Sequence, residues 1–440
     1  MRSENLYWVW LSLRLGVASR YITPMIERFE SPFDIYSATE EELSSMESIP
    51  KDVANSLANK NLEKAYEIID YCTANSIGIL SYADKYYPSR LRSIKDPPAV
   101  LYYKGNMVDF NEKLLISIVG TRKMSEYGKR AAYKIAYELA GADVIIVSGM
   151  ALGIDSVAAC GALNADGKTV AVLGCGIDVI YPKEHRKLQR IIESKGLVIT
   201  EFAPGTRPIG INFPIRNRII SGISQGTFVV EADDKSGAMI TARTALAQGR
   251  DIFALPGNID ESNAIGTNQL IKDGATAVIS VEDILNNYEP IYAKKINYSG
   301  LAFSKSAFVY SEAVFDKMEI ASRTYGSHKS IKKLDSSEFR PKRKPVLESD
   351  DKDMPTTVYR SELKEPPRRA MPHKDGSEEI LSQMDEMTRN IFAEIPMDRA
   401  TSVEKLCALG YTVGDITTAL TMLEIHGLVS SLPGGLYIKR

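Results

Sequence analysis

The sequence has few of the residues that mark disulfide-rich or metal-binding proteins. Its 440 residues include four cysteines and four histidines, and the cysteines lie far apart with no CxxC pair: Cys72, Cys160, Cys175 and Cys407. This pattern argues against a disulfide scaffold and a zinc finger, and it fits reduced thiols in a cytoplasm. We therefore expect a cytoplasmic protein that needs no metal ion and no other cofactor.

Long apolar runs are also missing. Charged residues or glycines interrupt every apolar stretch well short of 18 residues, so neither a membrane-spanning helix nor a membrane partner is expected. No small-residue cleavage site follows the N-terminal aromatics Tyr7, Trp8 and Trp10, which does not fit a signal peptide. Hydrophobic residues make up 44% and charged residues 25%, a globular composition, and the length exceeds what one domain usually needs.

The net charge of −2 hides an uneven distribution. Residues 183–218 hold eight basic and three acidic side chains, and residues 290–376 carry a net charge of +6, whereas residues 377–440 carry −4. The overall charge therefore does not exclude a nucleic-acid partner, because the positive charge is local.

The central part of the chain alternates between two kinds of segment. Continuous runs rich in β-branched residues, typical of strands buried on both faces, lie at 114–119, 144–147, 169–173, 197–200, 227–230 and 251–254. Helix-compatible segments separate them, at 127–139, 155–163, 184–193, 216–223 and 238–248. The alternation predicts an α/β domain with a Rossmann-like, mostly parallel sheet and helices on both faces.

The outer segments differ from this domain. We expect a small helical domain over residues 1–80, the Rossmann-like domain over 81–289, a charged flexible linker over 290–376 and a winged helix over 377–440. The linker is predicted because 19 of the 40 residues in 331–370 are charged and five are proline. Three helical segments and a terminal hairpin around Pro433-Gly434-Gly435 indicate the winged helix.

Small or basic residues follow the predicted strands. Gly120-Thr121-Arg122 comes after the first strand, Ser148-Gly149 after the second, Gly174-Cys175-Gly176 after the third, and Lys183 shortly later. Ligands of open parallel sheets bind beyond the carboxyl ends of the strands, where glycines and helix N-termini present N–H groups to phosphate. Any one of these loops is better explained as a tight turn, but together they predict a phosphate-binding edge.

Two familiar nucleotide motifs are absent. The first strand is not followed by GxGxxG, and no GxxxxGK[ST] occurs, so neither a dinucleotide site nor a P-loop is expected. The segment Phe213–Arg218 is unusual instead, since Arg216 and Arg218 flank Asn217 at a predicted helix start. These arginines suit phosphate binding; the alternative is an ion pair with Glu201 or Glu231.

These motifs, in this order, closely resemble the DprA/Smf family of DNA-processing proteins. The resemblance covers about residues 82–285 and includes Gly120-Thr121-Arg122, Ser148-Gly149-Met150, Phe213–Ser224, Leu255-Pro256-Gly257 and Gly266-Thr267-Asn268. One departure is His185, which stands where the family pattern usually has asparagine.

The resemblance implies a protein that is not an enzyme. It implies binding of single-stranded DNA without sequence preference, protection of that DNA, and loading of the RecA recombinase during natural transformation or recombination. Family members act as dimers, so a homodimer is expected, with room for other competence proteins as partners. By motif match, Arg122 and Lys183 are the principal phosphate contacts, and the remaining pocket residues are Gly120, Ser148, Gly149, Arg216, Asn217, Arg218, Ser236, Gly237 and Thr241.

The main alternative is an enzyme, a nucleotide-processing hydrolase of the phosphoribohydrolase (lysine-decarboxylase-like) kind. Such enzymes use a compact PGGxGTxxE stretch, whereas Pro256-Gly257 and Gly266-Thr267 are separated here by eight residues. Glu231 and Asp155 are isolated carboxylates that suit capping or positioning better than acid–base catalysis. The predicted helix 413–426 of the winged helix contains no lysine or arginine, so we expect residues 377–440 to serve protein contact rather than DNA binding.

Overall fold

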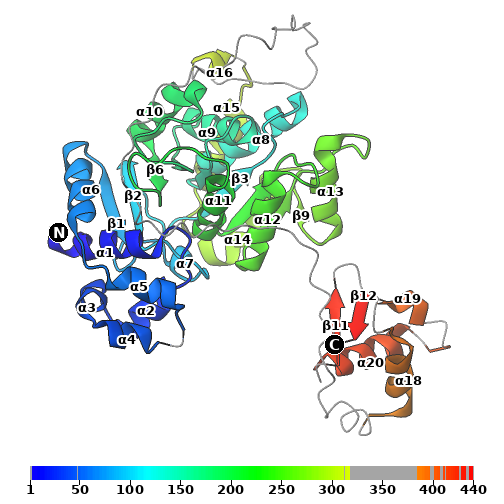
Figure 1. The fold of residues 1–440 in the computed structure, drawn as a ribbon. Coiled ribbons are helices and arrows are strands. Elements are labelled where there is room, and N and C mark those ends of the chain that lie inside the picture. The colour runs from blue at the N-terminus through cyan, green and yellow to red at the C-terminus, as the bar shows by residue number, and fades with distance from the viewer. Residues whose placement is uncertain are drawn as a thin grey trace, which may run out of the picture. The chain divides into compact units, whose positions relative to one another are not determined.

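The computed structural model describes residues 2–46, 48–311, 313–317, 384–396, 401–406, 410–411, 413–425, 428–432 and 436–439 (Figure 1). The chain divides into two units, Met1–Asp350 and Asp351–Arg440, each considered by itself. No helix among the described residues is both long and apolar enough to cross a membrane.

Six short helices open the first unit. They are α1 (Arg2–Leu15), α2 (Ile22–Phe29), α3 (Pro32–Ser37), α4 (Glu40–Ser44), α5 (Lys51–Ala58) and α6 (Glu63–Ala74). Thr39 and Glu42 form a reciprocal capping box that starts α4. Trp10 and Met25 are fully buried, and their core is continuous with one face of the sheet that follows. The helices are therefore packed onto the α/β domain.

A nine-stranded sheet forms the centre of the first unit. Its strands are β1 (Gly78–Ser81), β2 (Val100–Gly105), β3 (Leu115–Val119), β4 (Ile145–Ser148), β5 (Thr169–Val172), β6 (Leu197–Thr200), β7 (Gly226–Val229), β8 (Asp251–Ala254) and β9 (Thr276–Ala277). Their order is β1-β2-β6-β5-β4-β3-β7-β8-β9. Strands β3 to β9 are parallel, whereas β1 and β2 form an antiparallel edge. The Rossmann-like, mostly parallel fold predicted from the sequence is confirmed.

Helices cover both faces because alternate residues of each strand are buried on opposite sides. Ile116 and Ile118 of β3 belong to the core under α8 (Glu126–Gly141), α9 (Ile154–Asn164), α10 (Arg186–Lys195) and α14 (Glu282–Tyr292). Leu115 and Val119 belong to the core under α7 (Ser89–Arg92), α11 (Asn212–Ile223) and α12 (Gly237–Ala247). The 3₁₀ turns η1 (Lys183–His185) and η2 (Ser262–Ala264) precede α10 and α13 (Ile265–Lys272).

The domain continues beyond residue 290, where the sequence predicts a linker. Helices α15 (Tyr298–Ala307) and α16 (Ala313–Lys317) follow α14, and α15 packs against α8 (Figure 1). Phe308 and Phe315 meet the ring of Tyr133 on α8, with centroids 5.9 and 5.5 Å away. The predicted start of the linker is therefore wrong, because aromatic burial orders this segment. Residues 318–376 of that prediction lie outside the described residues.

The described part of the second unit contains helices and a small sheet. Its elements are α18 (Glu386–Glu394), β10 (Thr401–Ser402), α19 (Val403–Leu406), α20 (Val413–Ile425), β11 (Val429–Leu432) and β12 (Leu436–Lys439). The strands pair antiparallel in the order β10-β12-β11. Ile416, Leu420 and Leu423 of α20 are fully buried in its core. This sequence of elements is compatible with the predicted winged helix, which remains a prediction.

Candidate nucleic-acid interface

The order of the strands fixes where a ligand can bind. The chain starts the parallel sheet at β3, builds β4 to β6 on one side of it, and then returns to add β7 and β8 on the other side. The carboxyl ends of β3 and β7 therefore flank a topological switch point, which is the usual ligand crevice in an open α/β sheet.

Two adjoining cavities open at this crevice, and together we call them the groove. The larger has a volume of about 450 Å³ and the smaller about 40 Å³; both are lined by Arg122, Phe213 and Arg216. Seven of the eleven residues predicted to bind DNA line the groove: Gly120, Arg122, Gly149, Arg216, Asn217, Gly237 and Thr241. Lys123 lines it as well, a residue that the sequence analysis missed although it adjoins Arg122.

Arg122 presents an exposed cation to the groove. It lies on the loop between β3 and α8, and its guanidinium carbon is 5.8 Å from the centre of the Phe213 ring. The centre of the Phe213 ring in turn lies 5.2 Å from that of Tyr181, five residues after Gly176 of the third glycine loop. Arg122 makes no ion pair with any described residue, so its charge is available to a phosphate.

Lys183 lies beside the groove and not in its lining. It is exposed at the start of η1, two residues after Tyr181, which does line the smaller cavity. The structure thus brings Lys183 to the rim, where its flexible side chain remains in solvent.

Arg216 is buried beneath the groove. Only 4% of it is exposed, and its Nη1 donates to the Gly149 carbonyl at 2.7 Å and to the Val172 carbonyl. Burial lowers the pKa of Arg216 to about 10, with Asp155 opposing the shift, so the side chain stays charged at neutral pH. A Cβ at position 149 would lie 2.5 Å from the Arg216 guanidinium, which explains the glycine there.

A carboxylate already occupies the backbone amides of the second glycine loop. Asp155 Oδ2 accepts from the N–H of Gly149 at 3.0 Å and from that of Ala151 at 3.4 Å. Burial raises the pKa of Asp155, while Arg216 and these two amides oppose the shift. The Gly149 amide is thus not open to phosphate, which corrects the expectation that this loop presents its N–H groups to phosphate.

Three hydroxyl residues among the predicted contacts serve the fold. Ser148 is buried and its Oγ donates to the Ile118 carbonyl at 2.8 Å, so it lies between strands and not in the groove. Ser236 caps α12 by accepting from the Met239 N–H. Thr241 lines the groove from α12, but its hydroxyl donates to the Gly237 carbonyl at 3.2 Å. Gly237 remains exposed at the first turn of α12.

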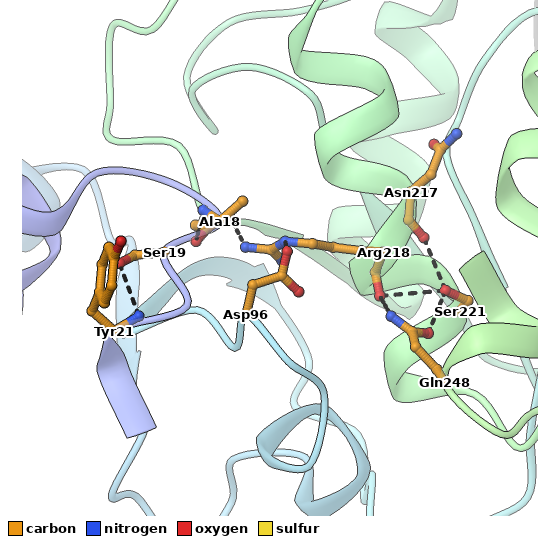
Figure 2. A network of polar contacts seen from close by, with 9 residues as sticks. Ala18, Ser19, Tyr21, Asp96, Asn217, Arg218, Ser221 and Gln248 are labelled. Carbon is orange, nitrogen blue, oxygen red and sulfur yellow. Dashed lines mark hydrogen bonds and ion pairs between the residues drawn. The ribbon is translucent and has the colours of Figure 1, made fainter. Parts of the chain in front are cut away.

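Arg218 is not a groove residue, and its predicted DNA contact is wrong. Its Nη2 lies 2.6 Å from Glu201 and its Nε 3.3 Å from Asp96, and the side chain is 6% exposed. Figure 2 shows it extending toward Asp96 and the loop of Ala18, while Asn217 points away from them. Successive residues of a helix face different directions, so Asn217 can line the groove while Arg218 cannot. The alternative of an ion pair with Glu201 is confirmed.

Glu231 caps a helix. Its carboxylate accepts from the N–H of Ser125 at 2.9 Å and from the Ser125 hydroxyl, and the same hydroxyl accepts from the Gly128 N–H at the start of α8. Burial raises the pKa of Glu231, and the Ser125 contacts oppose the shift. Both isolated carboxylates of the predicted edge, Glu231 and Asp155, are therefore engaged in positioning backbone amides.

Comparison with known proteins assigns the family. The model of the family DNA recombination-mediator protein A matches residues 78–289. The DNA processing protein DprA of Streptococcus pneumoniae is 42% identical over 209 residues, covering 48% of this chain and 73% of that protein. Its counterpart in Bacillus subtilis is 37% identical over 259 residues, covering 58% of this chain and 86% of that protein.

The solved structure of Streptococcus pneumoniae DprA is also similar. It has a TM-score of 0.53 and 33% sequence identity, and the match covers 63% of this chain and 95% of that one. The matched family is one of recombination mediators and not of enzymes. The chain belongs to the DprA/Smf family of DNA-processing proteins.

Proposed function

We propose that the chain binds single-stranded DNA through the groove, by its phosphate backbone and without reading its sequence. The observation that carries this proposal is Arg122, an exposed guanidinium held over an aromatic ring at the ligand edge of the sheet. Lys123 in the groove and Lys183 at its rim add positive charge along the same edge. Cations that neutralise phosphates supply most non-specific affinity for nucleic acid.

The aromatic residues favour a single strand over a duplex. Phe213 and Tyr181 pack together in the lining of the smaller cavity, and Tyr181 is 38% exposed. An aromatic face of this kind stacks on an unpaired base, whereas the bases of a duplex are stacked on each other. We therefore expect tighter binding of single-stranded than of double-stranded DNA.

The test is fluorescence anisotropy with labelled single-stranded DNA. Arg122→Ala should weaken binding at least fivefold, about 1 kcal/mol, and Lys183→Ala should weaken it less because Lys183 lies at the rim. Raising the salt from about 50 to 200 mM should lower the affinity of the wild-type protein as counterions are released.

Arg130→Ala is the matched control, since Arg130 is an exposed arginine on α8 that does not line the groove. Equal affinities of the Arg122→Ala and Arg130→Ala proteins would contradict the proposal, as would binding that does not respond to salt.

We further propose that the protein protects the bound strand in the cytoplasm, loads the RecA recombinase onto it during natural transformation or recombination, and acts as a homodimer. The family's description as a recombination mediator supports the first two roles.

A dimer is supported by the sheet edge at β9, next to which Ile279 is 82% exposed. Sedimentation of the Ile279→Glu protein tests the dimer, which this substitution should dissociate. RecA loading is tested separately, by measuring RecA filament formation on single-stranded DNA to which the protein is bound.

A further inference from the structure

A second cavity lies at the same edge of the sheet but outside the groove. It has a volume of about 530 Å³ and opens at the carboxyl ends of β7 and β8, next to the start of α8. Two segments that the groove does not use form much of its wall: the loop after β8, with Pro256 and Asn258, and η2 together with Glu261, the residue that precedes it. A cavity of this volume fits a nucleoside-sized molecule.

The charge of this cavity is opposite to that of the groove. Of the described residues that line it, none is a lysine or an arginine, and two are Glu231 and Glu261. The two carboxylates are close enough that Glu261 contributes to raising the pKa of Glu231, after the larger effect of burial. A phosphate would be repelled here, whereas a neutral ligand with N–H donors would be attracted.

One of the two carboxylates is free to accept such a donor. Both oxygens of Glu231 already accept from Ser125, but no described residue donates to the exposed side chain of Glu261. Tyr127 supplies a flat wall, because its hydroxyl donates to the Pro256 carbonyl at 2.9 Å and fixes the ring beside the cavity. A flat apolar wall beside a carboxylate is the arrangement that binds a base by its face and its amino edge.

We propose that this cavity binds a nucleobase that carries an exocyclic amino group, with the base against Tyr127 and the amino group donating to Glu261. Cytosine, adenine and guanine have such a group and thymine does not. The proposal rests on the proposed function for one of its two sources of ligand, a base of the bound strand; the other source is a free nucleoside. The phosphates bind without sequence preference in the groove, and the cavity adds a preference among bases.

The groove and the cavity share one wall, the loop Thr121–Ser125. Its Thr121 N–H donates to the Glu231 carbonyl at 2.8 Å, and its Lys123 carbonyl accepts from Asn263 Nδ2 at 2.9 Å. Arg122 and Lys123 line the groove side of this loop, and Ser125 lines the cavity side. A strand whose phosphate contacts Arg122 can therefore turn a neighbouring base across the loop into the cavity.

The experiment compares the full-length protein bound to oligo-dC and to oligo-dT, with free cytidine and thymidine as separate ligands in calorimetry. The wild type should bind oligo-dC at least threefold more tightly than oligo-dT. Glu261→Ala and Tyr127→Ala should each bring that ratio close to one while leaving the affinity for oligo-dT unchanged. Asp260→Ala is the matched control, because Asp260 is exposed next to Glu261 and does not line the cavity.

The two sources of ligand give different results. Cytidine binding that Glu261→Ala abolishes identifies a free nucleoside as a ligand of the cavity, and it would do so even if no oligonucleotide bound and the proposed function failed. A retained oligo-dC preference without cytidine binding identifies a base of the strand. Equal affinities for oligo-dC and oligo-dT together with no cytidine binding would overturn the proposal. If both oligonucleotides still bound tightly in that case, the proposed binding of single-stranded DNA by the groove would stand.

Discussion

Two arginines of this chain illustrate how the surroundings of a residue decide its role. Arg122 is exposed at the groove, whereas Arg218 is buried and forms ion pairs with Glu201 and with Asp96. Figure 2 shows the Arg218 side chain extending toward Asp96. Burial raises the pKa of both carboxylates and Arg218 lowers it, so the pair depends on this one cation. Glu201 also accepts from the Ala18 N–H at 3.1 Å, which links the ion pair to the N-terminal helices.

Arg218→Ala should therefore destabilise the protein. Removing one partner of a buried ion pair leaves uncompensated charge, and we expect a loss of about 3 kcal/mol in the free energy of unfolding. Arg122→Ala should change it by less than about 0.5 kcal/mol, because Arg122 is a surface residue. Urea denaturation of both variants measures the difference. An Arg218→Ala protein as stable as the wild type would show that the ion pair contributes nothing.

The buried His185 should make the folding stability of the protein depend on pH. It is fully buried, its Nδ1 lies 3.0 Å from the Met150 carbonyl, and its Nε2 has no hydrogen-bond partner among the described residues. Burial lowers the pKa of His185 below its usual 6.5, and the Met150 carbonyl only partly opposes this. The unfolded chain thus takes up a proton at a higher pH than the folded protein does, so stability falls as the pH drops below about 6.5.

The comparison of the wild type with His185→Asn isolates this effect, because asparagine does not titrate. Between neutral pH and about pH 5.5 the wild type should lose more thermal stability than the variant. Buried carboxylates with raised pKa values that lie away from His185, such as Glu201, shift stability in the opposite direction, but they are present in both proteins. Parallel curves of melting temperature against pH would contradict the assignment.

At the scale of elements, the sequence predicts those strands whose residues are mostly buried, because burial leaves an apolar run in the sequence. The six continuous apolar runs all became parallel strands: five are buried along their whole length, and β8 is buried in its second half. The two-residue edge strand β9 was missed since it is exposed and carries no apolar pattern. Helix α11 begins at Asn212, four residues before its predicted start at Arg216, with Pro214 in its first turn.

The candidate site was predictable only in part. The glycine loops and Arg122 could be assigned because parallel strands end at one edge of the sheet. For Arg218 the sequence offered the ion pair with Glu201 only as an alternative, and it did not suggest Asp96, which is 122 positions away and is brought close only by the folded chain. For Asp155 the sequence predicted a capping or positioning role but not its partner, the Gly149 amide, which the carboxylate reaches through the shape of one loop.

Helices α15 and α16 should stabilise the first unit. Phe315 and Leu301 are almost completely buried, and the Lys129 ammonium lies 4.6 Å from the centre of the Phe315 ring. A protein that ends at residue 297 should therefore unfold at least about 3 kcal/mol more easily than one that ends at residue 317, since two large apolar side chains lose their burial. Thermal denaturation of the two shortened proteins measures this, and equal melting temperatures would exclude a stabilising role for α15 and α16.

At the scale of the whole molecule, the lack of basic residues in α20 argues against DNA binding by the second unit. Asp415 is the only charged residue in the first turn of α20, and no lysine or arginine occurs in that helix. Deleting residues 377–440 should thus leave the affinity for single-stranded DNA within about twofold, roughly 0.4 kcal/mol. Anisotropy of the shortened and full-length proteins tests this. A duplex bound by the isolated fragment 377–440 at physiological salt would show that the second unit is itself a DNA-binding domain.

The carboxylate of Asp155 has a consequence for selectivity in a cell rich in small anions. Unoccupied backbone amides at a sheet edge would bind inorganic phosphate or free nucleotides. These small anions are abundant and would compete with DNA for the site. Because Asp155 accepts from the Gly149 and Ala151 amides, these two N–H groups are closed to a lone anion, whereas the exposed cations of the groove can attract it. A polymer offers several phosphates to those cations at once, so its advantage over any monomer grows with each contact.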